Sequence, residues 1–357
     1  MKILIVWDRM GDYHRSRVDT YRAMYVNDLL CTADLSGADN LYKWKNTAHN
    51  KHFVLSNKQA GQVDLWQRFK KFKQIVKTHQ IDKVVLSGYG STTYLLFTIW
   101  LKLKGKNTYM FAESWYPGKA FVDGMKGLFL KCFVKGVFAS GKRAEAHFTK
   151  RLNYPKHQIR TGYSVVDNAH FNFERSLSEV TKALDYKPIL LCVARYAEEK
   201  NLALLIAAFE NSELSSKWQL QLVGGGPLKD ALQHKIVDPA KVQLLNWQSY
   251  EDLPLLYQKA SCFILPSKFE PWGLVVNEAM AAALPIILSD ECGCLPDLLC
   301  DNGYAFTADI VEELVMVLDN LNAKSALELH TMGQKSKKII LKYSPFSWAE
   351  NLNKLIE

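Results

Sequence analysis

Residues 261–290 read SCFILPSKFEPWGLVVNEAMAAALPIILSD, and they place one helix between two apolar runs. The runs SCFILPS (261–267) and PIILSD (285–290) are short and rich in large apolar residues, which is typical of buried strands. A helix is expected to begin near Gly273 and to continue through the apolar residues before Pro285. A strand, a helix and a second strand in this order predict a parallel sheet with a helical crossover.

The same alternation extends over both halves of the chain and predicts two doubly wound, Rossmann-like α/β domains. In the first half we expect strands at 2–7, 82–88 and 107–114, and helical segments at 11–24, 65–79, 89–100 and 125–152, the last with a break near 136–141. A polar, irregular segment at 162–188 reads as a linker. In the second half we expect strands at 189–196, 218–223, 241–247, 261–267 and 285–290, with helices at 201–210, 228–236, 250–260 and 309–342.

The composition is that of an ordinary globular protein with an excess of positive charge. The 357 residues are 48% hydrophobic and 23% charged, with a formal net charge of +9. Such an excess favours an anionic partner: nucleic acid, a membrane surface or a phosphorylated substrate. The apolar run after Met1 is too short for a signal peptide, and the run 94–101 is too short to cross a bilayer. These features predict a cytoplasmic protein, either unattached or peripheral on the inner face of the membrane.

Seven cysteines occur, none of them in a CxxC pair. The many apolar residues make a disulfide scaffold unnecessary. Cys292, Cys294 and Cys300 lie close together, but no histidine accompanies them at a spacing typical of zinc sites. We therefore expect no metal site.

Two carboxylates, Glu270 and Glu278, flank an apolar run in the stretch quoted above. The first backbone amides of a helix that begins near Gly273 would attract an anion such as a diphosphate. On this interpretation both carboxylates would accept hydrogen bonds from hydroxyl groups on either side of that anion. The alternative is a surface helix, with Glu270 favourably placed near its N-terminus and Glu278 exposed. The spacing alone does not decide between them.

Two other groups of residues follow expected strands. Arg195 lies at the end of the strand 189–196 and Lys200 follows five residues later, at the edge where doubly wound sheets bind ligands, and both cations suit phosphate. Taken alone, the two cations are explained more simply by surface ion pairs with Glu198 and Glu199. Three glycines at 224–226 either allow a ligand to approach the backbone or only form a tight turn. They do not form the GxGxxG motif of nicotinamide-binding domains.

Taken in order, RY-x3-KN, LVGGGPL, LLNW and LPSKFEPWGLVVNEAMAAALPIILSD resemble the C-terminal domain of family 4 retaining glycosyltransferases, which have the GT-B fold. The family's E-x7-E signature is matched by Glu270 and Glu278. The resemblance is dense over about 189–300. It implies a GT-B protein with two Rossmann-like domains facing a central cleft: 1–165, to which the terminal helix 344–357 crosses back, and a nucleotide-sugar domain at 166–343.

The resemblance also implies roles for individual residues. Arg195 and Lys200 would stabilise the donor diphosphate as it leaves, and Glu270 would bind hydroxyls of the donor sugar. Glu278 would bind the ribose. The other donor-binding residues implied are Gly11, Gly224, Gly225, Asn246, Trp247, Trp272, Gly273, Leu274 and Val275.

The first half departs from the family pattern at two places. Its first loop reads DRMGDYHR, where many members have a pair of glycines. Glu113 and Ser114 follow the strand TYMFA, where many members have a histidine. Asp12, His14 and Glu113 are the candidates for the acceptor side.

The implied reaction moves a sugar from a UDP- or GDP-linked donor to a glycan or lipid-linked saccharide, with retention and without a metal or other cofactor. No DxD triplet occurs in the chain, in agreement with a metal-independent transfer. The product would belong to a cell-surface polysaccharide or glycoconjugate. The alternatives are a GT-B protein that binds a nucleotide sugar or a membrane partner without catalysis, and an epimerase of the nucleotide sugar.

Two basic segments, 65–77 and 125–151, alternate lysines with large aromatic residues. Such a surface suits an anionic membrane leaflet, whereas a core-facing helix with solvated lysines explains it more simply. No nucleic-acid-binding motif is present, so nucleic acid is not an expected partner. The aromatic residues concerned are Trp66, Phe69, Phe72, Phe129, Phe133 and Phe138.

Overall fold

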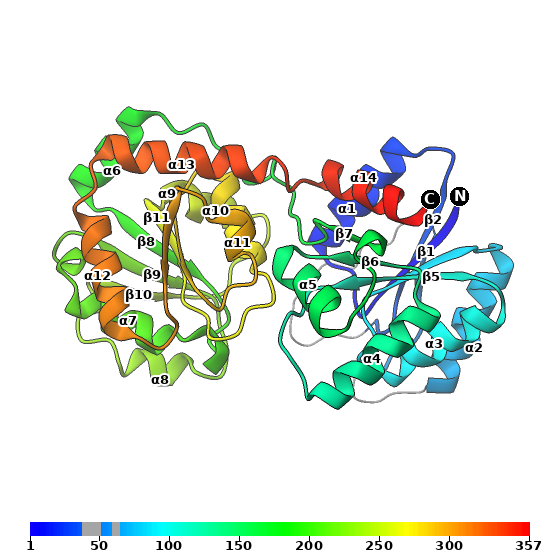
Figure 1. Ribbon diagram of the computed structural model, residues 1–357. Helices are drawn as coiled ribbons and strands as arrows, with labels where there is room; N and C mark the ends of the chain where they lie inside the picture. Colours follow the sequence, from blue (N-terminus) through cyan, green and yellow to red (C-terminus); the bar gives the residue numbers. More distant parts are fainter. Residues whose placement is uncertain (38–50, 59–64) are drawn as a thin grey trace. The chain divides into compact units, whose positions relative to one another are not determined.

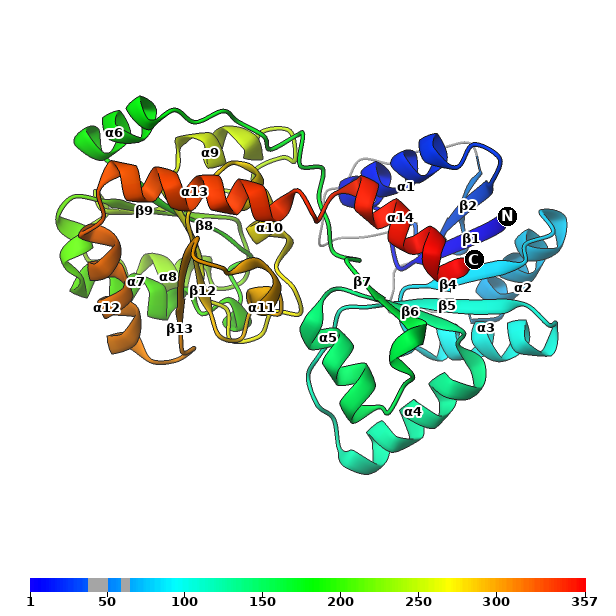
Figure 2. The same cartoon turned by 45° about the horizontal axis from the view of Figure 1, so that its top comes forward.

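The computed structural model describes residues 1–37, 51–58 and 65–357. They form two compact units (Figure 1). Unit 1 comprises Met1–Val165 together with Pro345–Glu357, and unit 2 comprises Val166–Ser344. Each unit is a parallel sheet with helices on both faces (Figures 1 and 2).

Among the described residues, the sheet of unit 1 has seven strands in the order β3-β2-β1-β4-β5-β6-β7, all parallel. The order reverses between β1 and β4, so this pair forms the switch point of the sheet. The strands are β1 (Lys2–Trp7), β2 (Leu29–Asp34), β3 (His52–Val54), β4 (Lys83–Leu86), β5 (Asn107–Ala112), β6 (Gly136–Ala139) and β7 (Ile159–Thr161).

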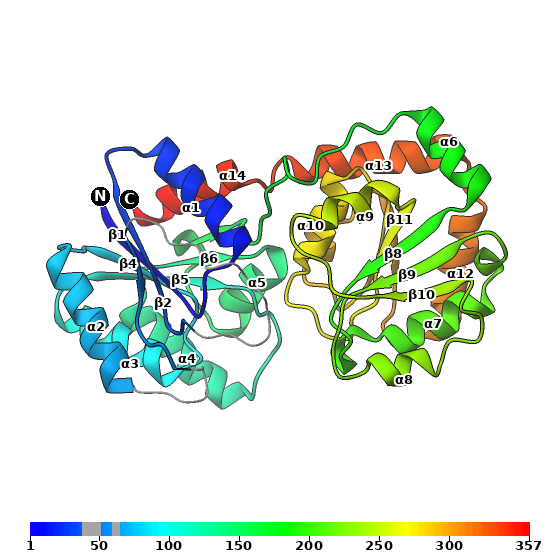
Figure 3. The same ribbon diagram turned by 180° about the vertical axis from the view of Figure 1, so that it is seen from behind.

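Helices cover the two faces of this sheet. One face carries α2 (Leu65–Thr78), α3 (Thr92–Leu103) and α4 (Ala120–Phe133), and the other carries α1 (Asp12–Met24) and α14 (Pro345–Ile356) (Figures 1 and 3). Short helical segments complete the unit: α5 (Lys142–Ala146), a π-helical turn (His147–Arg151) and a 3₁₀ turn (Lys156–Gln158).

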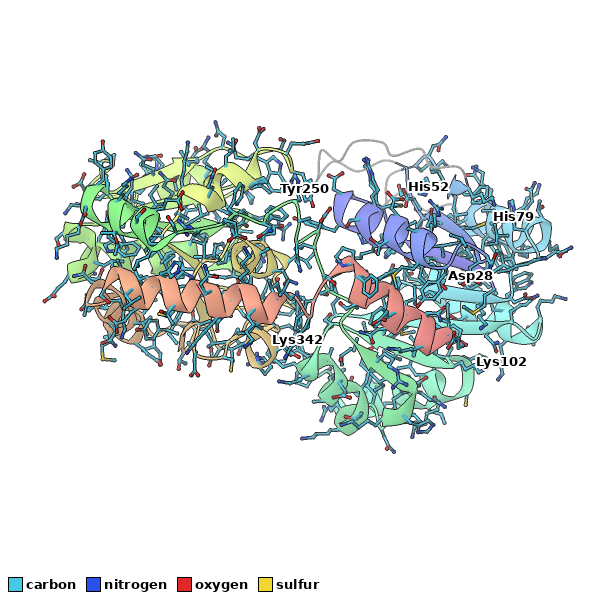
Figure 4. All side chains as sticks on the ribbon, turned by 90° about the horizontal axis from the view of Figure 1, so that it is seen from above. Asp28, His52, His79, Lys102, Tyr250 and Lys342 are labelled. Atoms are coloured by element: carbon cyan, nitrogen blue, oxygen red, sulfur yellow. The ribbon has the colours of Figure 1, made fainter. Side chains whose placement is uncertain are left out.

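The final helix, α14, is an integral part of unit 1. Trp348 is fully buried, and its ring lies 6.1 Å from that of Phe111 and 6.0 Å from that of Phe138. Tyr21 Oη of α1 lies 3.1 Å from Asn353 Oδ1 and 2.9 Å from Asp28 Oδ2, and Asp28 occupies the bend that follows α1 (Figure 4). Residues from both ends of the chain therefore share one core.

The sheet of unit 2 has six parallel strands in the order β10-β9-β8-β11-β12-β13, with its switch point between β8 and β11. The strands are β8 (Ile189–Val193), β9 (Gln219–Val223), β10 (Val242–Leu245), β11 (Cys262–Leu265), β12 (Ile286–Ser289) and β13 (Gly303–Phe306). The helices are α6 (Leu177–Tyr186), α7 (Leu202–Asn211), α8 (Lys229–Gln233), α9 (Leu253–Lys259), α10 (Leu274–Ala281), α11 (Leu295–Leu298), α12 (Val311–Asn322) and α13 (Ala326–Ile340), with 3₁₀ turns at Glu198–Lys200 and Glu213–Ser216.

The central strands of both sheets are continuous apolar runs, because helices bury them on both faces. Every residue of β11, β12 and β6 is buried. The predicted pair of doubly wound α/β domains is therefore confirmed.

Two predictions about secondary structure were wrong. The segment Gly136–Ala139 is strand β6 rather than a break in one long helix, and Phe138 on it is fully buried. The segment 162–188 is not an irregular linker, since it contains α6, whose N-terminus is capped by reciprocal bonds between Ser176 and Glu179. Both errors arise because these elements are too short or too polar to show a clear period.

The packing also contradicts part of the predicted membrane surface. Phe69 and Phe72 on α2 belong to the core, as does Phe138 on β6. Phe129 packs against the core from α4. For these residues the simpler interpretation, a core-facing apolar side with solvated lysines, is correct.

Candidate functional site

The candidate residues of unit 2 all follow the carboxyl ends of parallel strands, so they share one edge of the sheet. Arg195 and Lys200 follow β8. Glu270 follows β11, which is the neighbour of β8 across the switch point. The others lie after β9 (Gly224, Gly225), after β10 (Asn246, Trp247) and after β11 (Trp272, Gly273, Leu274, Val275, Glu278).

An ion pair joins the two sides of the switch point. Lys200 Nζ lies 2.6 Å from Glu270 Oε2, and the two side chains are only 15% and 12% exposed. The 3₁₀ turn that carries Lys200 is held against the β11 loop, because the amide of Lys268 donates to the carbonyl of Glu199 at 2.8 Å. The cation and the carboxylate are thus fixed at the crevice where doubly wound sheets bind ligands.

Arg195 takes a different position. Its guanidinium pairs with Glu199, and its side chain is 41% exposed. Burial tends to raise the pKa of Glu199, but a bond from its own backbone amide and the charge of Arg195 lower the pKa on balance. The surface ion pair considered from the sequence is thus present for Arg195, whereas Lys200 points to Glu270 instead.

The turn before α10 depends on Gly273. Its φ of +98° lies in the left-handed region, and a Cβ there would stand 3.0 Å from Leu265 Cδ2. The helix begins at Leu274, as predicted, so its first amides face the edge that carries Lys200. Trp272 is buried, and its indole nitrogen donates to Asn277 Oδ1 at 2.9 Å. Trp272 therefore braces this turn through its side chain.

Glu278 is fully buried on α10. Tyr257 Oη, from α9, donates to Glu278 Oε2 at 2.6 Å. A buried carboxylate requires hydrogen-bond donors around it, and the Tyr257 hydroxyl is one such donor. The alternative of a surface helix with Glu278 exposed is therefore wrong.

The glycine run after β9 serves two purposes. Gly224 has a φ of +155°, and a Cβ on it would lie 2.0 Å from the carbonyl oxygen of Ala194, so the close approach to the β8 end requires glycine. Gly225 is different, because nothing lies within 4 Å of the position of its Cβ. Its carbonyl accepts from the amide of Tyr196 at 2.9 Å. Gly224 is thus explained by packing, and Gly225 borders open space.

Asn246 and Trp247 lie beside this loop at the end of β10. Lys229 Nζ donates to Asn246 Oδ1 at 2.8 Å. Trp247 is 48% exposed, which is high for a tryptophan. The pair thus offers a polar group and an exposed aromatic ring.

In unit 1, Gly11, Asp12 and His14 lie where β1 leads into α1. The amide of Gly11 donates to His14 Nδ1 at 3.0 Å, and the rings of His14 and Trp7 are 4.7 Å apart. Burial, followed by repulsion from Arg17, lowers the pKa of His14 well below its usual value. Since Nδ1 accepts, the proton of the neutral ring is on Nε2. Asp12 lies in the first turn of α1, 3.9 Å from Arg15.

Glu113 follows β5 at the same edge of the sheet and is exposed. The buried hydroxyl of Ser164 donates to Glu113 Oε1 at 3.1 Å. The three acceptor-side candidates of unit 1 therefore share the carboxyl edge of one sheet, where they follow β1 and β5.

Among residues 1–37, 51–58 and 65–357, no three His, Cys, Asp or Glu side chains are grouped so that they could hold a metal ion. No helix of that part is long and apolar enough to cross a bilayer. Burial raises the pKa of the Cys292 thiol to about 12, and Cys294 is also buried.

Comparisons with known proteins agree with this geometry. The family model described as "Glycosyl transferases group 1" matches residues 174–339. This segment makes up a little less than half of the chain. The matched segment holds every candidate residue of unit 2 named above.

Among similar proteins, an uncharacterized glycosyltransferase of Methanocaldococcus jannaschii is 27% identical over 207 residues, which cover 54% of this chain and 52% of that protein. A sulfoquinovosyl transferase of Arabidopsis thaliana is 28% identical over 173 residues, 46% of this chain and 33% of that protein. The chain thus aligns with about half or less of the length of these relatives.

Solved structures match the chain over almost its full length. Anabaena HepE in complex with UDP and glucose gives a TM-score of 0.75 at 16% identity, covering 99% of this chain and 98% of that one. Sucrose-phosphate synthase from Thermosynechococcus elongatus gives 0.78 at 15% identity, covering 99% and 98%. The predicted GT-B fold is confirmed by these matches, whereas assignment to family 4 stays a prediction.

In unit 2, these residues combine a cation, the first amides of a helix and two buried carboxylates at one sheet edge. Such a set suits a ligand with an anionic centre and hydroxyl groups on both sides. Sequence reasoning did not identify Tyr257, which contacts Glu278. Its only signal is a hydroxyl among apolar residues on the helix 253–259.

A second residue missed from the sequence lies in unit 1. Asp34, at the end of β2, accepts from the amide of Met10 at 2.8 Å and therefore holds the loop before Gly11. His52 on β3 reaches Asp34 Oδ2 with Nε2 at 3.3 Å and Thr32 Oγ1 with Nδ1 at 2.9 Å (Figure 4). Only the pairing of β2 with β3, which the sequence did not predict, brings these three side chains together.

Proposed function

We propose that this protein is a retaining, metal-independent glycosyltransferase. It moves a sugar from a UDP- or GDP-linked donor to a glycan or a lipid-linked saccharide, in the synthesis of a cell-surface polysaccharide or glycoconjugate. The observation that carries the proposal is the largely buried Lys200–Glu270 pair beside the first amides of α10, at the switch point of the sheet in the segment that the family model matches.

Each donor group has a chemical counterpart in unit 2. The diphosphate would accept from Lys200, from Arg195 and from the amides of Leu274 and Val275. Glu270, in the turn that precedes those amides, would accept from hydroxyls of the donor sugar.

The nucleoside half of the donor would be bound farther along the same edge. Glu278 would accept from the ribose hydroxyls, because its second oxygen can still bind when Tyr257 donates to the first. Asn246 and the exposed ring of Trp247 would contact the base, and Gly225 borders open space beside them. The presence of UDP and glucose in the related Anabaena structure supports a nucleotide sugar as the donor.

The reaction would need little more than this arrangement. The bond from the anomeric carbon to the diphosphate oxygen breaks, and a bond from that carbon to the acceptor oxygen forms on the same face. The departing phosphate oxygen takes the acceptor's proton, so neither a second carboxylate nor a metal is required. Lys200 and the helix amides supply fixed positive potential where negative charge develops.

Unit 1 would bind the acceptor. The neutral ring of His14, exposed Glu113 and Asp12 lie at the carboxyl edge of its sheet and offer donors and acceptors for sugar hydroxyls. The proposal places the transfer on the cytoplasmic side, where nucleotide sugars are made.

The test is nucleotide release. The protein is incubated with UDP- and GDP-sugars and with extracts that contain glycan or lipid-linked acceptors. We expect UDP or GDP to appear only with the correct donor and acceptor, with and without EDTA, and a product with the donor's anomeric configuration by NMR.

Two lysine variants sharpen this test. Lys200→Ala should reduce release at least about a hundredfold. Lys268→Ala is the matched control, because Lys268 lies in the same loop but pairs with Asp309 at 3.0 Å. Nucleotide-sugar binding without release would favour an inert binding protein, and sugar interconversion without an acceptor would favour an epimerase.

A further inference from the structure

Helix α4 carries an apolar stripe on its outer side. Phe121, Met125 and Leu128 are 79%, 60% and 66% exposed, and Cys132 is exposed as well. The spacing of i, i+4, i+7 and i+11 puts these four side chains on one face of the helix. Three large apolar side chains in a row on a solvent-facing helix mark a docking surface more often than a lone exposed leucine does.

The opposite side of α4 is firmly packed, so the stripe cannot simply turn inward. Asp123 accepts from Arg151 Nε at 2.8 Å and from the amide of Gly118 at 3.0 Å. A Cβ on Gly127 would lie 2.1 Å from the carbonyl oxygen of Leu152, and Leu130 is fully buried. At about 100° per residue, these buried positions lie roughly half a turn away from the stripe.

The positive charge of the protein is concentrated around this helix. Residues 65–151 contain 17 Lys and Arg against 4 Asp and Glu, a net +13. The rest of the chain has 28 basic and 32 acidic residues, a net −4. The segment thus carries more than the whole net charge of +9.

Lysines also flank the stripe itself. Lys119 precedes α4 and Lys131 lies beside the apolar row, and both are exposed, whereas Lys126 Nζ turns toward the packed side and lies 3.7 Å from Asp123 Oδ1. The neighbouring helix α3 ends with exposed Leu103 beside Lys102 on the same face of the sheet (Figure 3). Apolar side chains between lysines match a lipid surface, where the former enter the acyl boundary and the latter meet anionic headgroups.

We propose that the α4 face, defined as Phe121, Met125, Leu128 and Cys132 with Lys119 and Lys131, docks on an anionic lipid bilayer. Unit 1 then lies on the membrane surface without crossing it. The proposal goes beyond the transferase function and does not depend on it. The membrane-facing residues proposed here differ from the aromatic residues expected from the sequence, several of which are in the core.

The test is co-sedimentation of the full chain with vesicles of phosphatidylcholine alone and with 30 mol% phosphatidylglycerol added. We expect binding to the anionic vesicles only, weakening as salt rises. The variant F121Q/M125Q/L128Q should lose about tenfold or more in apparent affinity. Lys119→Glu with Lys131→Glu should lose at least about fivefold for each lysine.

Matched controls come from unit 2. Met316 and Leu327 are 59% and 60% exposed there, so M316Q/L327Q makes a similar change away from α4 and should bind as the wild type does. Circular dichroism should show unchanged folding for all variants, because the altered side chains are exposed. Since no donor is present, failure of this test is independent of failure of the transferase assay.

Two cysteines provide a second readout. Cys132 and Cys300 are exposed and the other five are buried. An environment-sensitive dye on Cys132, in a Cys300→Ser background, should shift to the blue with anionic vesicles, whereas a dye on Cys300 in a Cys132→Ser background should not. The proposal is overturned if anionic vesicles leave both dyes unchanged. It is equally overturned if the glutamine and glutamate variants bind like the wild type, or if light scattering shows that the stripe instead joins two copies of the chain.

Discussion

The Lys200–Glu270 pair allows a direct test of how unit 2 is held together. Lys200→Met removes the cation and keeps most of the aliphatic stem, which leaves the Glu270 carboxylate nearly buried without its nearest positive charge. Glu270→Gln with Lys200→Met removes both charges. The surface pair of Arg195 with Glu199 provides the comparison.

The magnitude follows from burial. Removing one partner of a fully buried ion pair costs about 3–5 kcal/mol. Because Lys200 and Glu270 are still 15% and 12% exposed, some water reaches the carboxylate, and we expect about 2–3 kcal/mol for Lys200→Met. Arg195→Met should cost less than about 1 kcal/mol, because its side chain is 41% exposed.

The assay is calorimetric unfolding of the full chain without ligand, read from the transition of unit 2. For a unit of this size, the expected loss lowers the midpoint by roughly 5–10 °C in Lys200→Met. The double variant should return to within about 1 kcal/mol of the wild type, because no uncompensated charge remains.

Two outcomes would refute this reasoning. If Lys200→Met unfolds within a degree of the wild type, the pair is open to solvent and contributes no more than a surface contact. If the double variant is as unstable as the sum of the single ones, the two side chains do not interact.

Three further predictions concern single residues. Glu278→Ala should weaken the binding of the nucleoside diphosphate more than Glu270→Ala, as measured by calorimetry, because it removes the buried acceptor proposed for the ribose; equal losses would reject these roles. Gly224→Ala should destabilise the fold by at least about 3 kcal/mol, because its Cβ would collide with a backbone carbonyl and its φ is positive. Gly225→Ala should have the stability of the wild type but bind the nucleotide more weakly. Urea titration measures the first effect and a nucleotide-binding assay the second. Burial lowers the pKa of His14, so below about pH 6.5 the unfolded chain binds more protons than the native one and stability falls as pH falls; His14→Asn should flatten this dependence in thermal unfolding between pH 7 and pH 5, and an unchanged slope would contradict it.

The sequence predicted most of the fold because buried parallel strands are continuous apolar runs. β8 and β11 were recognisable in this way, and so was the start of α10 after Gly273. β6 was not, because four residues with a glycine at the start show no period that separates a strand from a helix break. Short elements depend on their neighbours in space for their identity.

The site was only partly predictable for a related reason. The order of Arg195, Lys200 and Glu270 along the chain suggested a ligand, but the spacing of the two glutamates left a surface helix equally acceptable. The contact of Tyr257 with Glu278 and that of Lys200 with Glu270 join residues 21 and 70 positions apart. Such contacts follow from the strand order, which the local pattern does not contain.

The return of α14 to unit 1 has a consequence for synthesis on the ribosome. Trp348 completes a core whose other residues, such as Phe111 and Phe138, are translated much earlier. At about 5–20 residues per second, translation of residues 166–344 takes roughly ten to forty seconds. During that time the core of unit 1 lacks α14 and leaves apolar side chains exposed, whereas unit 2, once translated, has all of its residues and can fold. The half of the protein that is made first is therefore the half that finishes folding last, and it is the one expected to need a chaperone.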